Sequence, residues 1–408
     1  MYINNKYIED LDDNDIKALL ENKIRESKTL EYKRQLNISD DKDKSKLEFI
    51  CDIISLYNTE GGCIIYGIQE GKDDKNKNTG YPIQLYHQNF DQPDALILQI
   101  QSIIKYNTAP SIINIIIRFI KVDEITVMII GVPKGLGLPT MVTLNEANKF
   151  YKRNNNGKYA VDVYELNQLF MQHAGVRENA VTFQANRIKD VLSGTIYPTV
   201  NTQGGFFLHA IPIDFQKDNL VDFSVLRGSE LSESIEPIRF YTDLDETYPQ
   251  YQSSYNYDGF MTSFRKAENS SIYSYNQFFR NGIIEFFTGG FYEPVSLENG
   301  KRTFLYGDAL VKGTIECIKK AIIIWKTFKI EPPFLILIQF NAPAAILLVG
   351  SSHSVKITRN PITLPVIYFE KFNLTTEDIF QQMVKYFDII WQAAGQRGCP
   401  PKKSFFES

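Results

Sequence analysis

Residues 26–36 read ESKTLEYKRQL, and residues 46–71 read KLEFICDIISLYNTEGGCIIYGIQEG. The first segment alternates apolar and charged residues from Thr29 onward, which is typical of a strand with one buried face. The second begins as a helix with a wide apolar surface, which predicts burial between a sheet and another layer. Gly61 and Gly62 end that helix, and residues 63–68 form the apolar run of a central strand. We therefore take this stretch as the core of an α+β fold.

The flanking sequence extends this pattern and predicts two domains. Residues 10–26 place carboxylates at the start of a helix with apolar residues at helical spacing. Further helices are expected at 93–105, 163–173, 180–193, 309–328 and 375–394, and strands at 112–120, 125–132, 149–153, 206–212, 283–287 and 334–340. Because 408 residues exceed one ordinary core, we divide the chain into a first domain at 1–178, a connecting helix and linker at 179–203, and a second α+β domain at 204–408.

Charge and cysteine content narrow the class of protein. A net charge of −4 gives no global basic field, so a nucleic-acid partner would need a local patch. The four cysteines and four histidines are dispersed without zinc spacing, which indicates a reduced intracellular setting and disfavours catalysis by imidazole. The N-terminus lacks signal-peptide character, and no apolar run is long enough to cross a bilayer. We expect a cytoplasmic protein without a membrane partner.

Three acidic residues lie at the ends of predicted elements: Glu26, Glu31 and Glu70. Glu26 and Glu31 can converge only if the chain bends between them, and the expected helix-to-strand change at residues 27–29 supplies that bend. Glu70 ends the apolar strand, where the edges of neighbouring strands meet. Three such carboxylates would bind Mg²⁺ or Mn²⁺, which can polarise a phosphate and activate water. The alternative is structural, because acids are common at such ends and the next loop offers competing aspartates.

Five cations near these acids could line a groove that holds phosphates: Lys28, Lys33, Arg34, Lys152 and Arg153. Three aromatic side chains interleave with them and could stack on bases: Tyr32, Phe150 and Tyr151. Tyr32 has the alternative of packing in the core, and each cation that of a solvated surface charge. The loop at residues 133–139 has two spaced glycines but lacks the GK[ST] ending of a P-loop, so it gives no nucleotide site.

Several ordered motifs resemble those of a known family. Residues 26–33, ESKTLEYK, resemble the pattern E-S-x-x-x-E-[FY]-K, and residues 57–62, YNTEGG, resemble A-[FY]-x-N-T-x-G-G. Residues 65–70, IYGIQE, are similar to an apolar strand leading to G-[VI]-x-[DE], and FYKRN at 150–154 is similar to Y-x-R-x-G. These patterns are those of the Schlafen core, an Alba-type nucleic-acid-binding domain of many bacterial proteins. The resemblance covers about residues 20–175 and implies a divergent Alba-like α+β domain with a mixed sheet packed with helices.

The second half resembles the C-terminal region that accompanies this domain in bacterial proteins often labelled ATP-binding. The matching segments are residues 255–259, YNYDG, residues 279–285, FRNGIIE, and the pair Pro332-Pro333. The resemblance implies no secure chemistry for this region.

In the nuclease members of the Schlafen family, three acids coordinate a divalent metal that cleaves transfer or ribosomal RNA. The resemblance places this role on Glu26, Glu31 and Glu70, with Mg²⁺ or Mn²⁺ as cofactor. Glu70 stands where the family usually has Asp, which lengthens the ligand arm. The animal nucleases of the family use two copies of the domain as a clamp, and this chain shows one, so a homodimer could supply the second.

Three functions follow as alternatives. The first is a metal-dependent endonuclease for RNA, with a substrate resembling transfer RNA. The second is a non-catalytic regulator that binds DNA or RNA through the first domain, while the C-terminal domain senses a ligand or mediates dimerisation. The third is an ATP-binding protein, and it rests on the family label alone.

Overall fold

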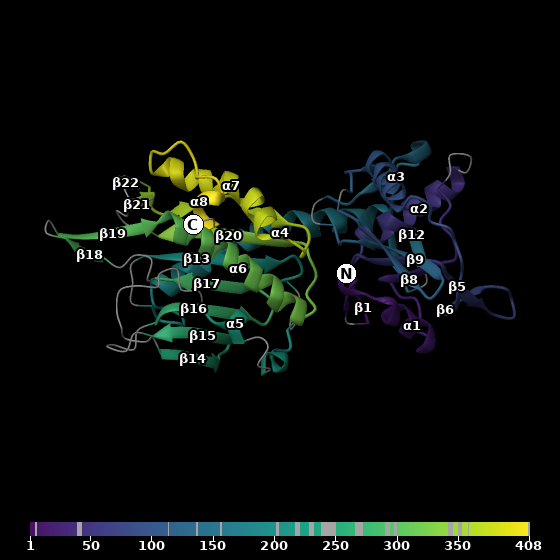
Figure 1. Ribbon diagram of the computed structural model, residues 1–408, viewed down its shortest axis with the longest axis horizontal. Coiled ribbons are helices and arrows are strands. Elements are labelled where there is room, and N and C mark those ends of the chain that lie inside the picture. Colours follow the sequence, from purple (N-terminus) through teal and green to yellow (C-terminus); the bar gives the residue numbers. More distant parts are fainter. Residues whose placement is uncertain are drawn as a thin grey trace. The chain divides into compact units, whose positions relative to one another are not determined.

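A computed structural model of the chain is shown in Figure 1. The chain divides into two compact units, Met1–Val176 with Glu331–Pro333, and Arg177–Ile330 with Phe334–Ser408. The structure describes residues 1–4, 6–38, 43–112, 114–135, 138–155, 157–200, 204–216, 221–227, 232–237, 250–265, 272–289, 294–297, 300–341, 346–349, 353–357 and 359–406. Within these ranges, no helix combines the length and the apolar character that crossing a bilayer requires.

The first unit is built around a mixed sheet with the strand order β3-β4-β9-β8. β3 (Leu30–Lys33) runs parallel to β4 (Gly62–Tyr66), and β9 (Ile125–Val132) and β8 (Ile116–Val122) continue the sheet in antiparallel fashion. Parallel neighbours need a crossover of a dozen or more residues, which the helix α2 (Asp43–Tyr57) supplies. The α+β class, the mixed sheet and the central position of the apolar strand are therefore confirmed.

The close approach of β3 and β4 depends on a glycine. Gly62 has φ +146°, and a Cβ at this position would collide with the carbonyl group of Thr29. The amide of Cys63 donates to the Thr29 carbonyl oxygen at 2.8 Å and starts the parallel ladder. Glycine is therefore needed here for two reasons, the left-handed backbone and the missing side chain.

The helix α2 is buried on two faces, as its apolar pattern predicts. Ile50, Ile53 and Ile54 have 0% exposed surface. The helix packs against β4 and β9 and also contacts a second sheet with the order β12-β11-β10-β7. The strands of this second sheet are β7 (Thr108–Ala109), β10 (Met141–Val142), β11 (Lys149–Asn154) and β12 (Gly157–Ala160).

The Asn-Thr pair at the end of α2 fixes the second sheet. Asn58 Nδ2 donates to the carbonyl oxygens of Thr140 and Tyr151 at 2.7 and 3.1 Å, and Asn58 Oδ1 accepts from Thr140 N at 2.8 Å. Thr59 Oγ1 accepts from the backbone amide of Arg153 at 3.1 Å. These bonds set the position of β11, and with it the position of the Arg153 side chain.

The remaining elements of the first unit surround this core. β5 and β6 pair as an antiparallel hairpin that leaves the mixed sheet after Tyr66, because Gly67 turns the chain with φ +95°. The elements are the helices α1 (Asp13–Glu21), α3 (Pro93–Tyr106), η1 (Ile8–Asp10) and η2 (Leu144–Glu146), and the strands β1 (Tyr2–Ile3), β2 (Lys6–Tyr7), β5 (Ile68–Lys72) and β6 (Asn78–Leu85).

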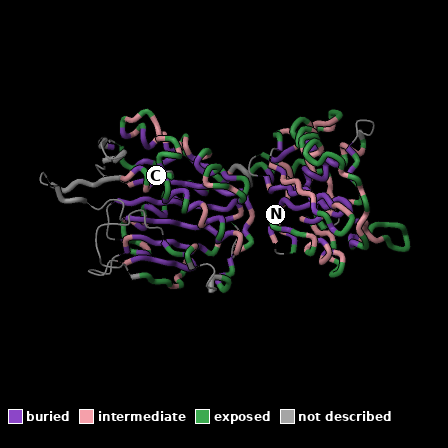
Figure 2. The backbone as a smooth tube through the Cα atoms, viewed as in Figure 1, coloured by how far each residue is buried: buried purple, intermediate pink, exposed green. Residues whose placement is uncertain are grey.

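The second unit contains a large antiparallel sheet with the order β14-β15-β16-β17-β13-β20-β23, and β24 also pairs with β20. β13 (Gly205–Pro212) is buried along its whole length, and Figure 2 shows buried backbone running through this sheet. The helix α6 (Gly307–Thr327) contacts β13. A smaller sheet has the order β18-β19-β21-β22.

The other elements of the second unit are as follows: β14 (Gln250–Tyr255), β15 (Gly259–Arg265), β16 (Ile272–Phe279), β17 (Ile284–Thr288), β18 (Pro294–Leu297), β19 (Gly300–Tyr306), β20 (Phe334–Asn341), β21 (Ile346–Val349), β22 (His353–Lys356), β23 (Ile362–Thr363), β24 (Ile367–Phe369), η3 (Phe223–Arg227), α5 (Ser232–Ile235), α7 (Thr376–Ala393) and α8 (Lys403–Phe406).

Two sequence predictions need correction. The helices expected at 163–173 and 180–193 are one helix, α4 (Val163–Leu192), of 30 residues. Gly175, inside this helix, costs about 1 kcal/mol relative to alanine. The continuous backbone hydrogen bonds of the helix outweigh that cost. The helix expected to end near Glu26 ends at Glu21, since Lys23 has a left-handed φ of 48°. The boundary between the two units falls inside α4, and residues 201–203 of the expected linker lie outside the described residues.

We predict that Asn58→Ala destabilises the first unit by about 2–4 kcal/mol, because a buried amide and two carbonyl groups lose their partner. Urea unfolding of the full chain should show an earlier first transition. Ser102→Ala, on the exposed side of α3, is the control and should leave that midpoint unchanged. A midpoint for Asn58→Ala equal to that of the control would show that these bonds contribute nothing net.

Candidate nucleic-acid site

The chain bends between Glu26 and Glu31, as their convergence requires. Ser27 and Leu30 close a tight turn through the bond from Ser27 N to Leu30 O at 3.0 Å. The turn brings the Glu26 carboxylate back to β3, where Oε1 accepts from the amide of Tyr32 at 2.7 Å. The amide of Glu26 donates to Gly80 O at 2.8 Å, which ties this segment to the β5–β6 hairpin that carries Glu70.

The carboxyl groups of Glu26 and Glu70 interact with each other, and the pKa of each is raised. Burial raises the pKa of Glu26 to about 8, and the charge of Glu31 and a hydrogen bond with Glu70 add to this rise. Burial also raises the pKa of Glu70, while the hydrogen bond from Glu26 opposes the rise. The proton at neutral pH therefore resides on Glu26. Glu70 Oε2 accepts from Asn78 Nδ2 at 2.5 Å. Glu70 Oε1 is buried, and the described residues offer it no hydrogen-bond donor other than Glu26.

Glu31 has a different environment and stays ionised. Its Oε1 lies 2.8 Å from Lys33 Nζ, and its Oε2 accepts from Arg153 Nη2. Burial pushes the pKa of Glu31 upward, but the charges of Lys33 and Arg153 outweigh burial and hold that pKa below its usual range. Side chains from β3 and β11 therefore meet around one carboxylate, on the face of the mixed sheet that α2 covers.

This ion pair belongs to a longer chain of alternating charges. Lys33 lies 3.5 Å from the buried carboxylate of Asp52 on α2, and Asp52 lies 2.6 Å from Lys158 of β12. Lys158 also approaches Glu48 at 3.6 Å. In order, the alternating charged residues are Arg153, Glu31, Lys33, Asp52, Lys158 and Glu48.

Sequence reasoning missed Asp52 and Lys158. Asp52 gave a usable signal, since it is an acid within an otherwise apolar helix face, whereas nothing in the sequence marks Lys158.

The five cations predicted to bind phosphate have different partners in the structure. Lys33 and Arg153 join Glu31, while Lys28 pairs with Glu60 at 2.7 Å. Lys152 lies 3.9 Å from Glu165, on the other side of β11 from Arg153 because side chains alternate along a strand. The guanidinium of Arg34 lies over the ring of Tyr86, 4.1 Å from its centroid.

The predicted aromatic contacts take structural roles in two places. Tyr32 has 0% exposed surface, and its hydroxyl donates to Ile24 O at 2.9 Å, so it belongs to the core. Phe150 packs edge to face with Phe170 at 6.3 Å between ring centroids. Tyr151 is partly buried against the cluster around α2.

The carboxylate oxygens have the chemistry that a hard divalent cation prefers. In the described part of the chain, however, no group of three or more His, Cys, Asp or Glu side chains is placed to hold a metal ion. Both oxygens of Glu31 are bound by cations, and Glu26 carries a proton. The arrangement as it stands can exchange a proton near neutral pH through Glu26.

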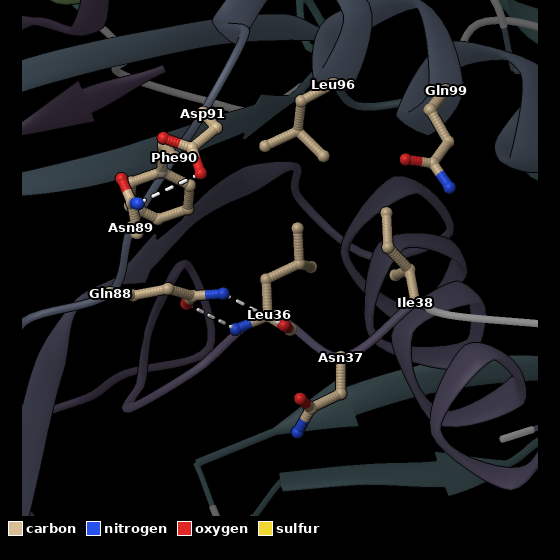
Figure 3. Close-up of a pocket in the computed structure, with 9 residues that line it drawn as sticks. All are labelled: Leu36, Asn37, Ile38, Gln88, Asn89, Phe90, Asp91, Leu96 and Gln99. Carbon is tan, nitrogen blue, oxygen red and sulfur yellow. Dashed lines mark hydrogen bonds between the residues drawn. The ribbon is translucent and has the colours of Figure 1, made fainter. Parts of the chain in front are cut away.

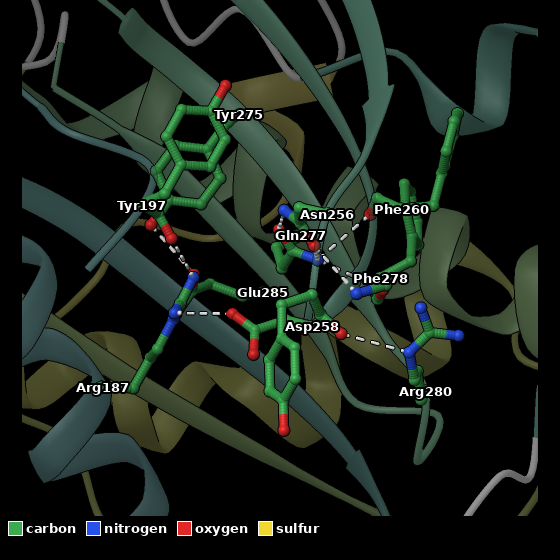
Figure 4. A network of polar contacts seen from close by, with 12 residues as sticks. Arg187, Tyr197, Asn256, Asp258, Phe260, Tyr275, Gln277, Phe278, Arg280 and Glu285 are labelled. Atoms are coloured by element: carbon green, nitrogen blue, oxygen red, sulfur yellow. Dashed lines mark hydrogen bonds and ion pairs between the residues drawn. The ribbon is translucent and has the colours of Figure 1, made fainter.

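The second unit contains a separate buried polar network, shown in Figure 4. Arg187 of α4 donates from Nε to Glu285 Oε1 at 3.1 Å and approaches Asp258 at 3.4 Å. His209 and the hydroxyl of Tyr275 also bind Glu285, at 2.7 and 2.9 Å. Burial raises the pKa of Glu285, but Arg187 and His209 outweigh it and lower that pKa to about 2.

This network joins the segments YNYDG and FRNGIIE, which carry Asp258 and Glu285, to the helix α4. Because Glu285 has 0% exposed surface, the network is a structural connection rather than an open site. The glycine loop at 133–139, for which no nucleotide site is predicted, includes Leu136 and Gly137, and these two lie outside the described residues.

Residues 26–162 match the family model described as Schlafen, AlbA_2. The first unit therefore carries a Schlafen/AlbA-type domain, as the sequence motifs predicted. No curated protein matches the chain.

Two solved structures are similar over part of the chain. The crystal structure of the DIP2311 protein from Corynebacterium diphtheriae is 14% identical, with 35% of this chain and 23% of that chain covered and a TM-score of 0.25. The solution structure of the N-terminal domain of an ATP-dependent DNA helicase RecG-related protein from Nitrosomonas europaea is 19% identical, with 35% and 88% covered and a TM-score of 0.27. The chain thus spans less than a quarter of the first structure, and at these TM-scores neither likeness carries an argument.

We predict that the stability of the first unit falls as pH rises from about 4.5, the ordinary pKa of a glutamate, to about 8. In this window the folded state keeps the proton on Glu26 while the unfolded state has lost it, so rising pH favours unfolding. Glu26→Gln, whose amide can donate to Glu70 and accept from Tyr32 N, should flatten the dependence of Tm on pH. The control Glu21→Gln, at the exposed end of α1, should keep the wild-type slope. Equal slopes for all three proteins would contradict a proton held on Glu26.

Proposed function

We propose that the first unit binds nucleic acid, with RNA favoured and DNA as the alternative. The observation that carries this proposal is the Schlafen/AlbA-type domain at residues 26–162. The charged cluster gives it a chemical basis, because Arg153 Nε and Nη1 are buried and have no acceptor among the described residues. A guanidinium with free donors can take a phosphate oxygen or a bridging water. The exposed cations Lys28 and Arg34 flank the same strand, β3.

The finer proposal is cleavage of RNA, of the transfer-RNA type, with Mn²⁺ or Mg²⁺ at Glu26, Glu31 and Glu70. Its support is that the charge of Glu31 raises the pKa of both Glu26 and Glu70, and that Glu70 Oε1 is buried without a donor other than Glu26 among the described residues. A divalent ion bound there would polarise a phosphate and activate water. The chain's own residues would have to change state: Glu26 would release its proton, and Lys33 and Arg153 would turn from Glu31 toward the phosphate.

A specific observation favours binding without cleavage as the second candidate. Glu31 is neutralised by Lys33 and Arg153, and Glu26 is protonated, so the cluster is electrostatically satisfied without a metal. In that case the protein is a regulator that binds DNA or RNA, and the second unit senses a ligand or mediates dimerisation. A homodimer remains part of both proposals. An ATP-binding role rests on resemblance alone, and stabilisation by ATP with Mg²⁺ in a thermal-shift experiment would test it.

We predict that the protein binds labelled transfer RNA, and that the affinity weakens as salt increases because phosphate contacts release counterions. Replacing Arg34 by Gln should weaken binding and lower the slope of log Kd against log salt by about 1. The control is Lys121→Gln, an exposed cation near the end of β8. An affinity that does not change with salt, or no binding at all, would contradict the proposal.

We predict that pure protein with Mn²⁺ cleaves this RNA, and that Glu31→Ala and Glu70→Gln each reduce cleavage at least a hundredfold, as removal of a group that stabilises transition-state charge does. Glu124→Gln, an exposed acid on the turn between β8 and β9, is the matched control. If wild type binds RNA but leaves it intact, the regulator is the correct alternative. If Glu31→Ala cleaves as well as wild type, the assignment of these acids is wrong.

A further inference from the structure

The first unit contains a cavity of about 370 Å³ beside the end of β3, shown in Figure 3. It lies between the segment after β3, the segment that follows β6 and the first turns of α3. Figure 3 shows the Leu36 and Leu96 side chains pointing into a common space, with Gln99 reaching toward it from α3. A volume of this size is at the small end of pockets that hold organic ligands.

The walls of this cavity are held by specific bonds. Gln88 Oε1 accepts from Leu36 N at 2.8 Å, and Gln88 Nε2 donates to Leu36 O at 3.1 Å. The Gln88 side chain therefore binds both backbone groups of Leu36 and holds the two segments together. Phe90 packs edge to face against Phe119 of β8 at 5.3 Å between ring centroids. The cavity is therefore preformed, because its walls are fixed by contacts that do not involve a ligand.

The lining combines apolar surface with neutral amides. Its apolar part comes from Leu36, Ile38, Phe90 and Leu96, and its polar part is mainly the side-chain amides of asparagine and glutamine. The one acid, Asp91, accepts from Asn89 Nδ2 at 2.9 Å. Among the lining residues that the structure describes there is no Lys, Arg or His. Such a site suits a flat neutral ring with donors and acceptors on its edge, and it suits neither a phosphate nor a cation.

A cation lies on the same segment as the lining residue Leu36. Arg34 is exposed and precedes Leu36 by two residues, and its guanidinium is held over the ring of Tyr86, two residues before Gln88. Gln35 Nε2 also donates to the Tyr86 hydroxyl at 3.2 Å. The two segments that build the cavity are thus also joined through a positive charge, which suits a nucleotide whose base is buried and whose phosphate is exposed.

We propose that this cavity holds one unpaired base of a bound RNA strand, with Arg34 against the adjoining phosphate. The proposal rests on the proposed nucleic-acid binding and extends it to a preference for single-stranded RNA. Proteins recognise RNA sequence mainly at splayed-out bases, which they stack on side chains and read by hydrogen bonds along the base edge. The amide of Gln99 supplies a donor and an acceptor of the type that pairs with a base edge.

The first test is titration of the ¹⁵N-labelled full chain with free nucleosides at millimolar concentration. We expect the side-chain amide signal of Gln99 to shift for at least one of adenosine, guanosine, cytidine and uridine, and not for ribose. No shift with any nucleoside would overturn the cavity proposal, whatever the protein does with RNA. A shift combined with no binding of any RNA would retain the base site and reject the proposed function.

The second test compares Gln99→Leu with Gln101→Leu, an exposed position two residues further along α3. Loss of the hydrogen bonds to a base edge should weaken binding of single-stranded RNA about tenfold. Binding of a fully paired RNA duplex should be unchanged, and Gln101→Leu should match wild type for both RNAs. Equal effects of Gln99→Leu on the single strand and the duplex, or no effect on either, would overturn the proposal while leaving general RNA binding intact.

Discussion

The parallel pairing of β3 with β4 is the constraint on which the first unit depends. It requires Gly62 at the point where β4 meets the Thr29 carbonyl, and it requires α2 as the crossover. With the register Glu31 opposite Ile64 and Lys33 opposite Tyr66, the charged face of β3 is directed to the side that α2 covers. The apolar face, with Tyr32, is directed to the core beside Ile24. Every contact of the candidate site follows from this placement.

The same placement separates the chemistry of two acids only five residues apart. Glu31 meets two cations and remains charged, whereas Glu26 meets another carboxyl group and keeps its proton. Low-dielectric surroundings act on both, and the identity of the nearest charge decides the outcome. In the second unit, the buried acid Glu285 is paired on every side that the contacts describe. There Arg187, His209 and Tyr275 bind the fully buried Glu285, and these bonds tie α4 to the large sheet.

Much of the fold was readable from the chain, because the signals were local. Alternation in residues 29–33, the double apolar face of α2 and the glycines at 61 and 62 each predict their element through backbone geometry and burial. Errors occurred where a local signal was outweighed. Gly175 suggests a break, but a helix with bonds on both sides of it continues. Glu26 lies outside α1, since the backbone turns at Lys23 before the apolar pattern ends.

The candidate site was predictable from the sequence only in part. The sequence by itself determined that acids and cations lie at the ends and on one face of β3, because side chains alternate along a strand. Only the tertiary structure decided which of them meet: Arg153 from β11 reaches Glu31, Asp52 and Lys158 extend the charges, and Lys28, Arg34 and Lys152 go elsewhere. The cavity beside Leu36 was equally invisible, since its walls join residues 36–38 to residues 88–99, which lie far from them in the chain. Pairings over such separations depend on packing and register, which no local pattern encodes.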